Sequence, residues 1–306
     1  MTVSRKDSTR PVSTNGHVRL NKDLERTLKR HPWAVATYTR LLDWRCRSTK
    51  TFAFVATTGR SGTNTLADLL SNQPGCVAVH EPYPAMTTSI NGSYRASESV
   101  VHAKIINILR TATGHRLYLE SSHQFLKNFA DPVIKHFGER VRVIHLTRDP
   151  VSVASSFYSI GSIPGVTELG RRYLIDPWRS DNELPIADAL ETMPELDHQL
   201  YRCLWYWYET EARVLRLIRE HPTLPVIHLT TQNLNEPHRL AELADFLSVG
   251  ELRSELVTRA GLRSNEKIPE KTRSVAHSEA VRMNEHLVAF LRDRFGVARV
   301  PIFKEA

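Results

Sequence analysis

A glycine-rich segment at residues 57–65, T-T-G-R-S-G-T-N-T, carries the most informative chemistry of the chain. It follows the apolar run F-A-F-V-A (52–56), which predicts a buried strand, and precedes L-A-D-L-L (66–70), which predicts a helix. Backbone N–H groups at the start of such a helix, together with the helix dipole, form an anion site. Gly59 and Gly62 allow the backbone to curl without Cβ clashes. The segment therefore predicts a phosphate-binding loop.

The side chains of this loop supply further donors, namely the guanidinium of Arg60 and the hydroxyls of Ser61, Thr63 and Thr65. The loop differs from that of the nucleoside triphosphatases, which requires G-x-x-x-x-G-K-[ST]. It has no Gly-Lys pair, and no obvious acidic magnesium ligand follows a hydrophobic strand. These differences argue against ATP or GTP hydrolysis and leave a small-molecule kinase as the alternative enzyme.

A second basic segment follows another predicted strand. Val141–Thr147 is apolar and strand-like, and R-D-P-V-S-V-A-S-S occupies residues 148–156. Pro150 suits the first turn of a helix. Arg148 and Ser156, eight residues apart, can hold one phosphate from two sides.

Together the two segments resemble the paired signatures of the sulfotransferases that use 3′-phosphoadenylyl sulfate (PAPS). In that family, [PTS]-x-[KR]-[ST]-G-[TS]-[TN] binds the 5′-phosphosulfate, and R-[DN]-P-x-x-x-x-x-S binds the 3′-phosphate through its Arg and Ser. Residues 58–64 and 148–156 fit these patterns, and L-N-E-P-H-R-L-A-E-L-A-D-F-L (234–247) is similar to a third segment of the family. The resemblance covers residues 50–250.

The resemblance implies transfer of a sulfuryl group from PAPS to a hydroxyl of a small-molecule, sugar or lipid acceptor, without a metal. It implies that Arg60 stabilises charge on the leaving phosphate. The phosphosulfate would be bound by Gly59, Arg60, Ser61, Gly62, Thr63, Asn64 and Thr65, and the 3′-phosphate by Arg148 and Ser156. The basic segment 259–273, with Lys267, Lys271 and Arg273, is the candidate to fold over the 3′-phosphate.

The chain departs from the family pattern at three places. Arg60 stands where animal cytosolic members carry Lys, and in this respect it resembles bacterial carbohydrate and lipid sulfotransferases. T-T-Q-N (230–233) replaces a tyrosine-containing segment, which puts the adenine contacts there in doubt. The closing segment R-K-G-x-x-G of the family is also missing.

An acceptor hydroxyl needs a general base, and two candidates follow predicted strands, where the ligands of open α/β sheets collect. Glu81, in V-A-V-H-E-P-Y-P, resembles the carboxylate base of bacterial and Golgi-type members. We expect its backbone to be extended because it precedes Pro82. His123, in L-Y-L-E-S-S-H, resembles the histidine base of cytosolic members and should approach the same space. Glu120 and His80 are the remaining candidates.

Short apolar runs alternate with helical stretches along the chain, which is typical of a parallel sheet covered on both faces. Strands are predicted over Phe52–Ala56, Val77–His80, Arg116–Leu119, Val141–Thr147 and Pro225–Leu229. Helices are predicted over Asn64–Ser71, Ser97–Thr113, Phe125–Phe137, Val151–Tyr158 and Leu196–Glu220. We therefore expect an α/β protein with a three-layer P-loop-type fold, in which helices flank a central parallel β-sheet.

The predicted organisation is a disordered tail over residues 1–18 and a single domain over residues 19–306. Asn21–Arg47 is amphipathic and predicts a helix interrupted near Pro32. Ser159–Pro194 is rich in Gly, Pro and mixed charge, and we expect a loop or lid over the acceptor site rather than part of the core.

The composition limits the alternatives. A net charge of +8 and a pI near 9.5 indicate an acidic partner. The arginines are scattered, and the aromatic residues 205–208 have the pattern of a buried helix, which disfavours a nucleic-acid-binding protein. Three distant cysteines and a polar N-terminus without a signal-peptide core predict a cytoplasmic protein without disulfides or zinc. The composition is compatible with a homo-oligomer.

Overall fold

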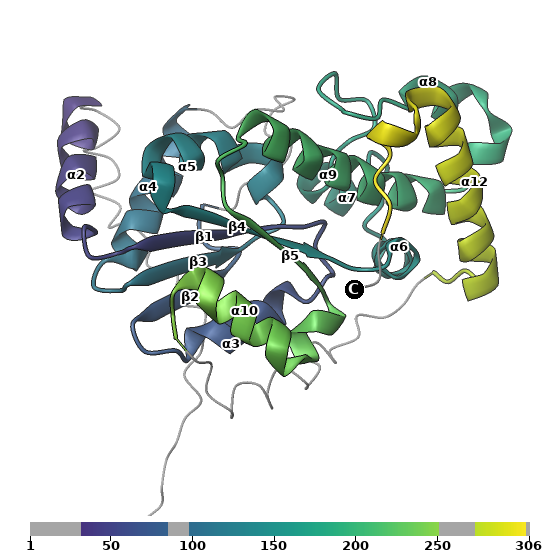
Figure 1. Cartoon of the computed structure of the whole chain (residues 1–306). Coiled ribbons are helices and arrows are strands. Elements are labelled where there is room, and N and C mark those ends of the chain that lie inside the picture. The colour runs from purple at the N-terminus through teal and green to yellow at the C-terminus, as the bar shows by residue number, and fades with distance from the viewer. Residues whose placement is uncertain (1–31, 85–97, 251–272, 304–306) are drawn as a thin grey trace, which may run out of the picture.

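Five parallel strands form the centre of the protein (Figure 1). The computed structural model describes residues 32–84, 98–250 and 273–303. The strands are β1 (Thr51–Ala56), β2 (Cys76–His80), β3 (Leu117–Ser121), β4 (Val141–Thr147) and β5 (Val226–Thr230). Their order is β2-β3-β1-β4-β5, and every neighbouring pair is parallel. This confirms the predicted three-layer α/β fold.

Helices cover both faces of this sheet because successive side chains of a strand point to opposite faces. Ala53 and Val55 of β1 pack with α3 (Thr63–Ser71) and α10 (Pro237–Leu247) on one face. Phe52 and Phe54 pack on the other face, against the layer formed by the remaining flanking helices. These are α2 (Pro32–Arg45), α4 (Glu98–Ala112), α5 (Ala130–Phe137) and part of α9 (Leu200–Glu220).

A further core lies beyond the carboxyl ends of the strands, at the right in Figure 1. It is built on α9, in which Trp205 and Trp207 are buried. Around α9 pack α6 (Pro150–Ser159), α7 (Glu168–Tyr173), α8 (Ala187–Thr192) and α12 (His277–Phe295). The burial predicted for the aromatic residues 205–208 is confirmed.

The prediction that Ser159–Pro194 lies outside the core is wrong. The segment contains α7 and α8, and Ile163, Leu174 and Ile186 are fully or almost fully buried in the core around α9. Its apolar residues are spaced without helical or strand periodicity among Gly, Pro and charged residues. The sequence pattern therefore gave no sign that a large aromatic helix would bury them.

Two predicted helices begin more than one residue away from the predicted start. The helix expected over Phe125–Phe137 begins with a π-helical turn, η1 (Phe125–Phe129), before α5. α9 begins at Leu200 instead of 196, because Pro194–Leu196 forms a separate 3₁₀ turn, η3. The other 3₁₀ turns are η2 (Gly138–Arg140), η4 (Gln232–Asn235) and η5 (Val297–Arg299).

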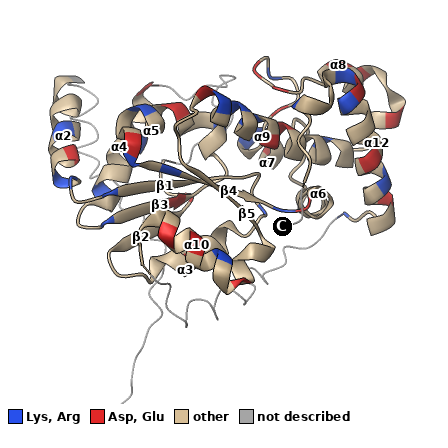
Figure 2. Ribbon diagram, in the orientation of Figure 1, with Lys and Arg blue, Asp and Glu red and all other residues tan. Residues whose placement is uncertain are grey.

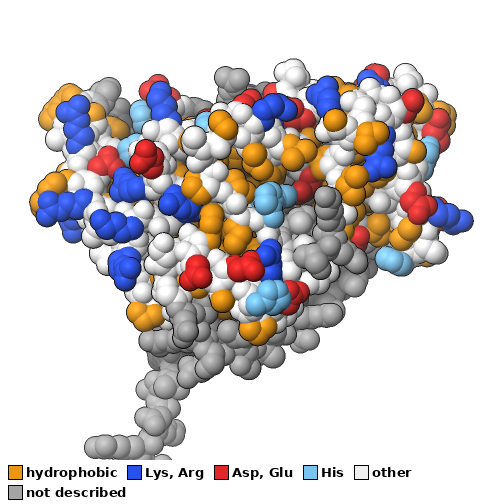
Figure 3. All heavy atoms as spheres, viewed as in Figure 1, with side chains coloured by type: hydrophobic (Ala, Val, Ile, Leu, Met, Phe, Trp, Pro, Cys, Tyr) orange, Lys and Arg blue, Asp and Glu red, His pale blue; other side chains and the backbone are white. Residues whose placement is uncertain are grey.

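Acidic and basic residues are mixed along α9, α10 and α12 in Figure 2. On α9 several of them are buried, including Glu209, Glu211 and Arg213. Lys and Arg side chains gather at the end of the molecule that carries α2 (Figure 3). The exposed basic residues there include Arg40, Arg45, Arg47 and Lys50. They lie near the amino ends of the strands, at the end of the sheet opposite the phosphate loop.

The predicted tail and the part of Asn21–Arg47 before residue 32 lie outside the described residues. Cys46, Cys76 and Cys203 are free and buried. Within the described ranges, no helix combines the length and the apolar character that a membrane span requires.

Candidate active site

The loop between β1 and α3 has a tightly curled backbone. The φ angles of Gly59, Arg60 and Gly62 are 86°, 58° and 86°, all in the left-handed region. Glycine adopts this region without steric cost, whereas a residue with a Cβ rarely does. Gly62 precedes α3 without a side-chain cap on the helix. The chain thus turns directly from the central strand into a helix start, as the motif predicted.

Side chains from four other parts of the fold bind the outer side of this loop. Each donates a hydrogen bond to a loop carbonyl: Tyr206 Oη to Thr58 (2.8 Å), Arg148 Nη1 to Arg60 (3.1 Å), Thr231 Oγ1 to Ser61 (3.0 Å) and Ser121 Oγ to Thr63 (2.8 Å). Among the described residues, none accepts a hydrogen bond from the backbone N–H groups of residues 60–63. The loop carbonyls are bound from behind, and no described residue competes with an anion for these amides.

The second motif meets the loop at Arg60. The Nε atom of Arg60 donates a hydrogen bond of 2.9 Å to Oγ of Ser156. The Arg148 guanidinium in turn donates to the backbone carbonyl of Arg60. Asp149 caps α6 through the N–H of Ser152 at 2.7 Å, with Pro150 in the first turn. The structure therefore brings together Arg60, Arg148 and Ser156, residues that lie up to 96 positions apart in the sequence.

The backbone of Arg148 is fixed by Trp207, whose indole Nε1 donates to the Arg148 carbonyl at 2.8 Å. Arg273 lies close to α6, the helix that follows Arg148, near its carboxyl end. Its Nη1 donates to Oε1 of Gln199 at 2.7 Å, and its guanidinium lies 5.9 Å from the centre of the Tyr158 ring, two residues after Ser156. Lys267 and Lys271 lie outside the described residues.

The two candidate bases lie side by side. His123 Nε2 is 3.2 Å from Oε1 of Glu81, although they follow different strands. Of the Glu81 side chain 45% is exposed, against 12% of the His123 side chain. A Cβ on Gly59 would lie 3.3 Å from His123 Cβ, so the phosphate loop is in contact with this pair. The pair and the loop form one continuous site.

The expected extended backbone at Glu81 is wrong, because its φ is 45°. The Glu81 N–H still donates to the carbonyl of Ser121 at 3.2 Å, which continues the β2–β3 pairing by one residue. The chain then turns at once toward Pro82. This left-handed turn, together with the β-pairing, places the carboxylate beside His123.

The remaining base candidate on β3, Glu120, is fully buried beneath α4. Its carboxylate binds Lys104 at 2.5 Å and accepts a hydrogen bond from the Tyr118 hydroxyl at 2.8 Å. Lys104 also donates to the carbonyl of Pro82 at 3.3 Å. Glu120 therefore anchors the segment next to Glu81 and has no access to an acceptor.

A buried lysine beside His123 was not among the predicted site residues. Nζ of Lys127, in η1, lies 2.6 Å from Nδ1 of His123. Burial, followed by the charge of Lys127 and then that of His80, holds the pKa of His123 well below its usual value. A single Lys within the apolar run F-L-K-N-F was the only signal in the sequence.

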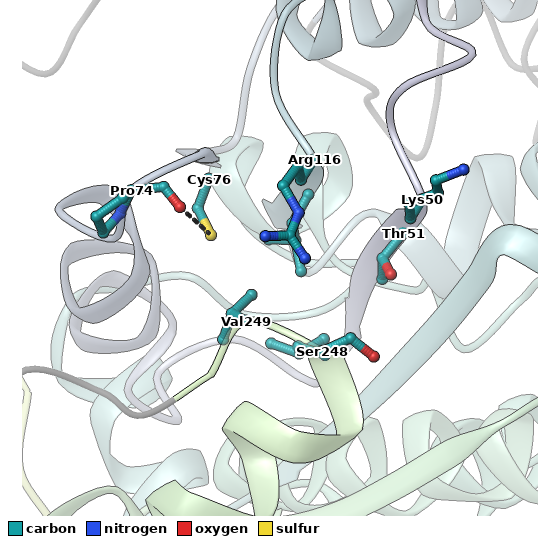
Figure 4. A pocket seen from close by; sticks show the side chains of 9 residues that line it. Lys50, Thr51, Pro74, Cys76, Arg116, Ser248 and Val249 are labelled. Carbon is teal, nitrogen blue, oxygen red and sulfur yellow. Dashed lines mark hydrogen bonds between the residues drawn. The ribbon is translucent and has the colours of Figure 1, made fainter.

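Two cavities beside the sheet are lined by described residues. One of about 420 Å³ lies between α4, η1, α5 and α9, and its lining includes Lys127, Arg179 and Arg213. The other, of about 260 Å³, lies at the amino ends of the strands and is lined in part by Lys50, Cys76 and Arg116 (Figure 4). The smaller cavity is at the opposite end of β1 from the phosphate loop and does not belong to this site.

No protein-family model and no curated protein matches this chain. Among solved structures, the sulfotransferase domain from the curacin biosynthetic pathway is similar, with 15% identity over 84% of this chain and 94% of that chain and a TM-score of 0.41. A sulfotransferase from Alicyclobacillus acidocaldarius has 17% identity over 82% and 94% of the two chains and a TM-score of 0.42.

Retinol dehydratase, crystallised with androsterone and the inactive cofactor PAP, has 16% identity over 80% of this chain and 81% of that chain, with a TM-score of 0.39.

Proposed function

We propose that this protein transfers the sulfuryl group of PAPS to a hydroxyl of a small-molecule, sugar or lipid acceptor. One observation carries the proposal: two motifs with phosphate-binding chemistry, separated by almost a hundred residues, converge on Arg60. PAPS carries a phosphate on the 5′ position and another on the 3′ position of one nucleoside, so it needs two such sites at a fixed spacing. A mononucleotide with a single phosphate chain has no use for the second motif.

The donor would be held by residues of both motifs. The N–H groups of residues 60–63 and the Arg60 guanidinium would bind the 5′-phosphosulfate. The side chains that hold the loop bind its carbonyls, so they do not compete with the donor for these N–H groups. Arg148 and Ser156 would bind the 3′-phosphate, with Arg273 and Lys267 as the second set of cations for the same group. The hydroxyls of Ser61, Thr63 and Thr65 and the amide of Asn64 would complete the cradle.

In the proposed reaction the acceptor oxygen forms a bond to sulfur while the bond from sulfur to the 5′-phosphate oxygen breaks. The acceptor proton passes to the Glu81–His123 pair, and 3′-phosphoadenosine 5′-phosphate leaves with the electrons of the broken bond. Sulfuryl transfer has a loose transition state with charge on the leaving phosphate, as in phosphoryl transfer. Arg60 would stabilise that charge, since a guanidinium stays protonated and binds two oxygens at once.

The decisive test pairs nucleotide binding with transfer. Calorimetric titration with 3′-phosphoadenosine 5′-phosphate, adenosine 5′-phosphate and ATP should give tight binding only for the first. Radiolabelled PAPS should then label members of a panel of phenolic, sugar and lipid hydroxyl acceptors, and Arg60→Ala should abolish the labelling. Tighter binding of ATP with transfer of its γ-phosphate would replace the proposal by a kinase.

A further inference from the structure

The surroundings of Lys127 are unusual for a lysine. Its side chain is buried in η1, and it lines the 420 Å³ cavity on one side and contacts His123 on the other. Nζ donates a hydrogen bond of 2.9 Å to the carbonyl of Tyr173, the last residue of α7. It also lies 4.9 Å above the centre of the Tyr206 ring, a favourable place for a cation. The amine is thus fixed in position by three different elements.

The contact between Lys127 and His123 determines which imidazole nitrogen carries the proton. An ammonium has three hydrogens and a neutral amine has two, so in either state Lys127 can donate both to Tyr173 and to Nδ1 of His123. On the other side of the ring the Glu81 carboxylate can only accept, so it takes the imidazole N–H from Nε2 and leaves Nδ1 unprotonated to accept from Lys127. A neutral imidazole has a single N–H, which is left on Nε2. Nε2 is the atom 3.2 Å from Oε1 of Glu81, and it donates to that carboxylate. The Gln124 amide nitrogen lies 3.2 Å from Nε2 and 3.4 Å from Nδ1, but its shorter hydrogen bond, of 2.8 Å, goes to the Tyr173 carbonyl.

We propose that Lys127 is a positioning residue that holds His123 as the Nε2-protonated tautomer and thereby makes Glu81 the general base. The role of Glu81 as general base rests on the proposed function, whereas the tautomer of His123 does not. A nitrogen that already carries its proton has no lone pair for the acceptor proton. The Glu81 carboxylate keeps its second oxygen for that proton, while His123 orients the first.

The charged groups around the pair favour a neutral histidine. Burial lowers the pKa of His123, and the charges of Lys127 and His80 lower it further. The pKa of Lys127 is itself well below its usual value because of burial, with Glu81 raising it and Arg213 and Arg179 lowering it. These shifts favour the uncharged form of His123, which serves as a fixed hydrogen-bond donor.

The tautomer can be measured directly, without a ligand. Long-range ¹H–¹⁵N NMR spectra of the ¹⁵N-histidine-labelled protein, assigned with a His123→Asn variant, distinguish protonated from unprotonated ring nitrogens. Between pH 6 and pH 8 we expect a protonated Nε2 and an unprotonated Nδ1. Lys127→Met keeps the length of the side chain but removes the donor. In this variant both tautomers of His123 should be populated. An Nδ1-protonated ring, or an imidazolium at pH 7, in the wild type would overturn the inference.

Kinetics provide the second arm. Lys127→Met should lower kcat at least tenfold and change KM for PAPS less than twofold, while Lys127→Gln, which retains an N–H donor, should recover much of the loss. Lys135→Met, an exposed lysine of α5, is the matched control and should leave kcat unchanged. Equal losses in the Met and Gln variants would overturn a donor role. If the wild type transfers no sulfuryl group, the proposed function fails, and the NMR result still decides the tautomer.

Discussion

Arg60→Ala tests the phosphate loop most directly. Its Nε donates to Ser156, and its two terminal nitrogens are the groups that would bind the donor oxygens. Loss of a positioned donor to a developing negative charge costs about 3–4 kcal/mol, or roughly 10²–10³ in kcat. We therefore expect kcat to fall by that factor in steady-state transfer from radiolabelled PAPS.

The substitution should leave the fold intact, because the Arg60 side chain is exposed and alanine also carries a Cβ, so the strain at φ 58° is unchanged. Thermal unfolding should therefore give the wild-type Tm. Ser155→Ala, one residue before the Arg60 partner on α6, serves as the control and should keep full activity. Wild-type kcat in a well-folded Arg60→Ala protein would refute the role of Arg60 as a stabiliser of the leaving phosphate.

Three further predictions follow from the site and its supports. Arg148→Ala should cost about 1.5–3 kcal/mol in binding of 3′-phosphoadenosine 5′-phosphate, and little in binding of adenosine 5′-phosphate; equal losses by calorimetry would contradict the assignment. Glu81→Gln should lower kcat about 100-fold or more at unchanged KM for PAPS, and a larger loss in His123→Ala alone would transfer the role of base. Burial lowers the pKa of His145, but Glu211, 2.8 Å away, outweighs it and raises that pKa above 6.5. The stabilisation is thus complete below pH 6.5 and is lost as the pH rises through the raised pKa, so in urea unfolding Glu211→Gln should cost about 1.5–3 kcal/mol at pH 6 and less at pH 9; a cost independent of pH would contradict this.

The sequence allowed the sheet to be predicted well because each strand is a short, continuous apolar run that ends at polar residues. β4 lies at its predicted bounds, and the other strand bounds differ by at most one residue except for the carboxyl end of β3, which reaches Ser121. The loop at 57–65 and the Arg148 segment were recognisable for a similar reason, since their geometry depends on local glycines, a proline and helix starts.

The partners of the site residues could not be predicted, because they are set by tertiary packing. Thr231 lies in a segment whose departure from the family pattern put the adenine contacts in doubt, yet its hydroxyl binds the Ser61 carbonyl. Tyr206 had the pattern of a core aromatic, and only its contact with Thr58 gives it a second role. The proximity of Glu81 and His123 was expected, but the lysine behind His123 was not.

The support of the phosphate loop from behind has a consequence for folding. Its four carbonyl contacts join residues 58 to 170 positions apart in the sequence, from β3, from the ends of β4 and β5, and from α9. Such distant contacts form late, because chain closure must precede them. The anion site is therefore complete only when the whole sheet and α9 have assembled. Any nucleotide that binds there acts as a reporter of the fully native state, and its binding energy is added to the global stability of the domain rather than to that of a local loop.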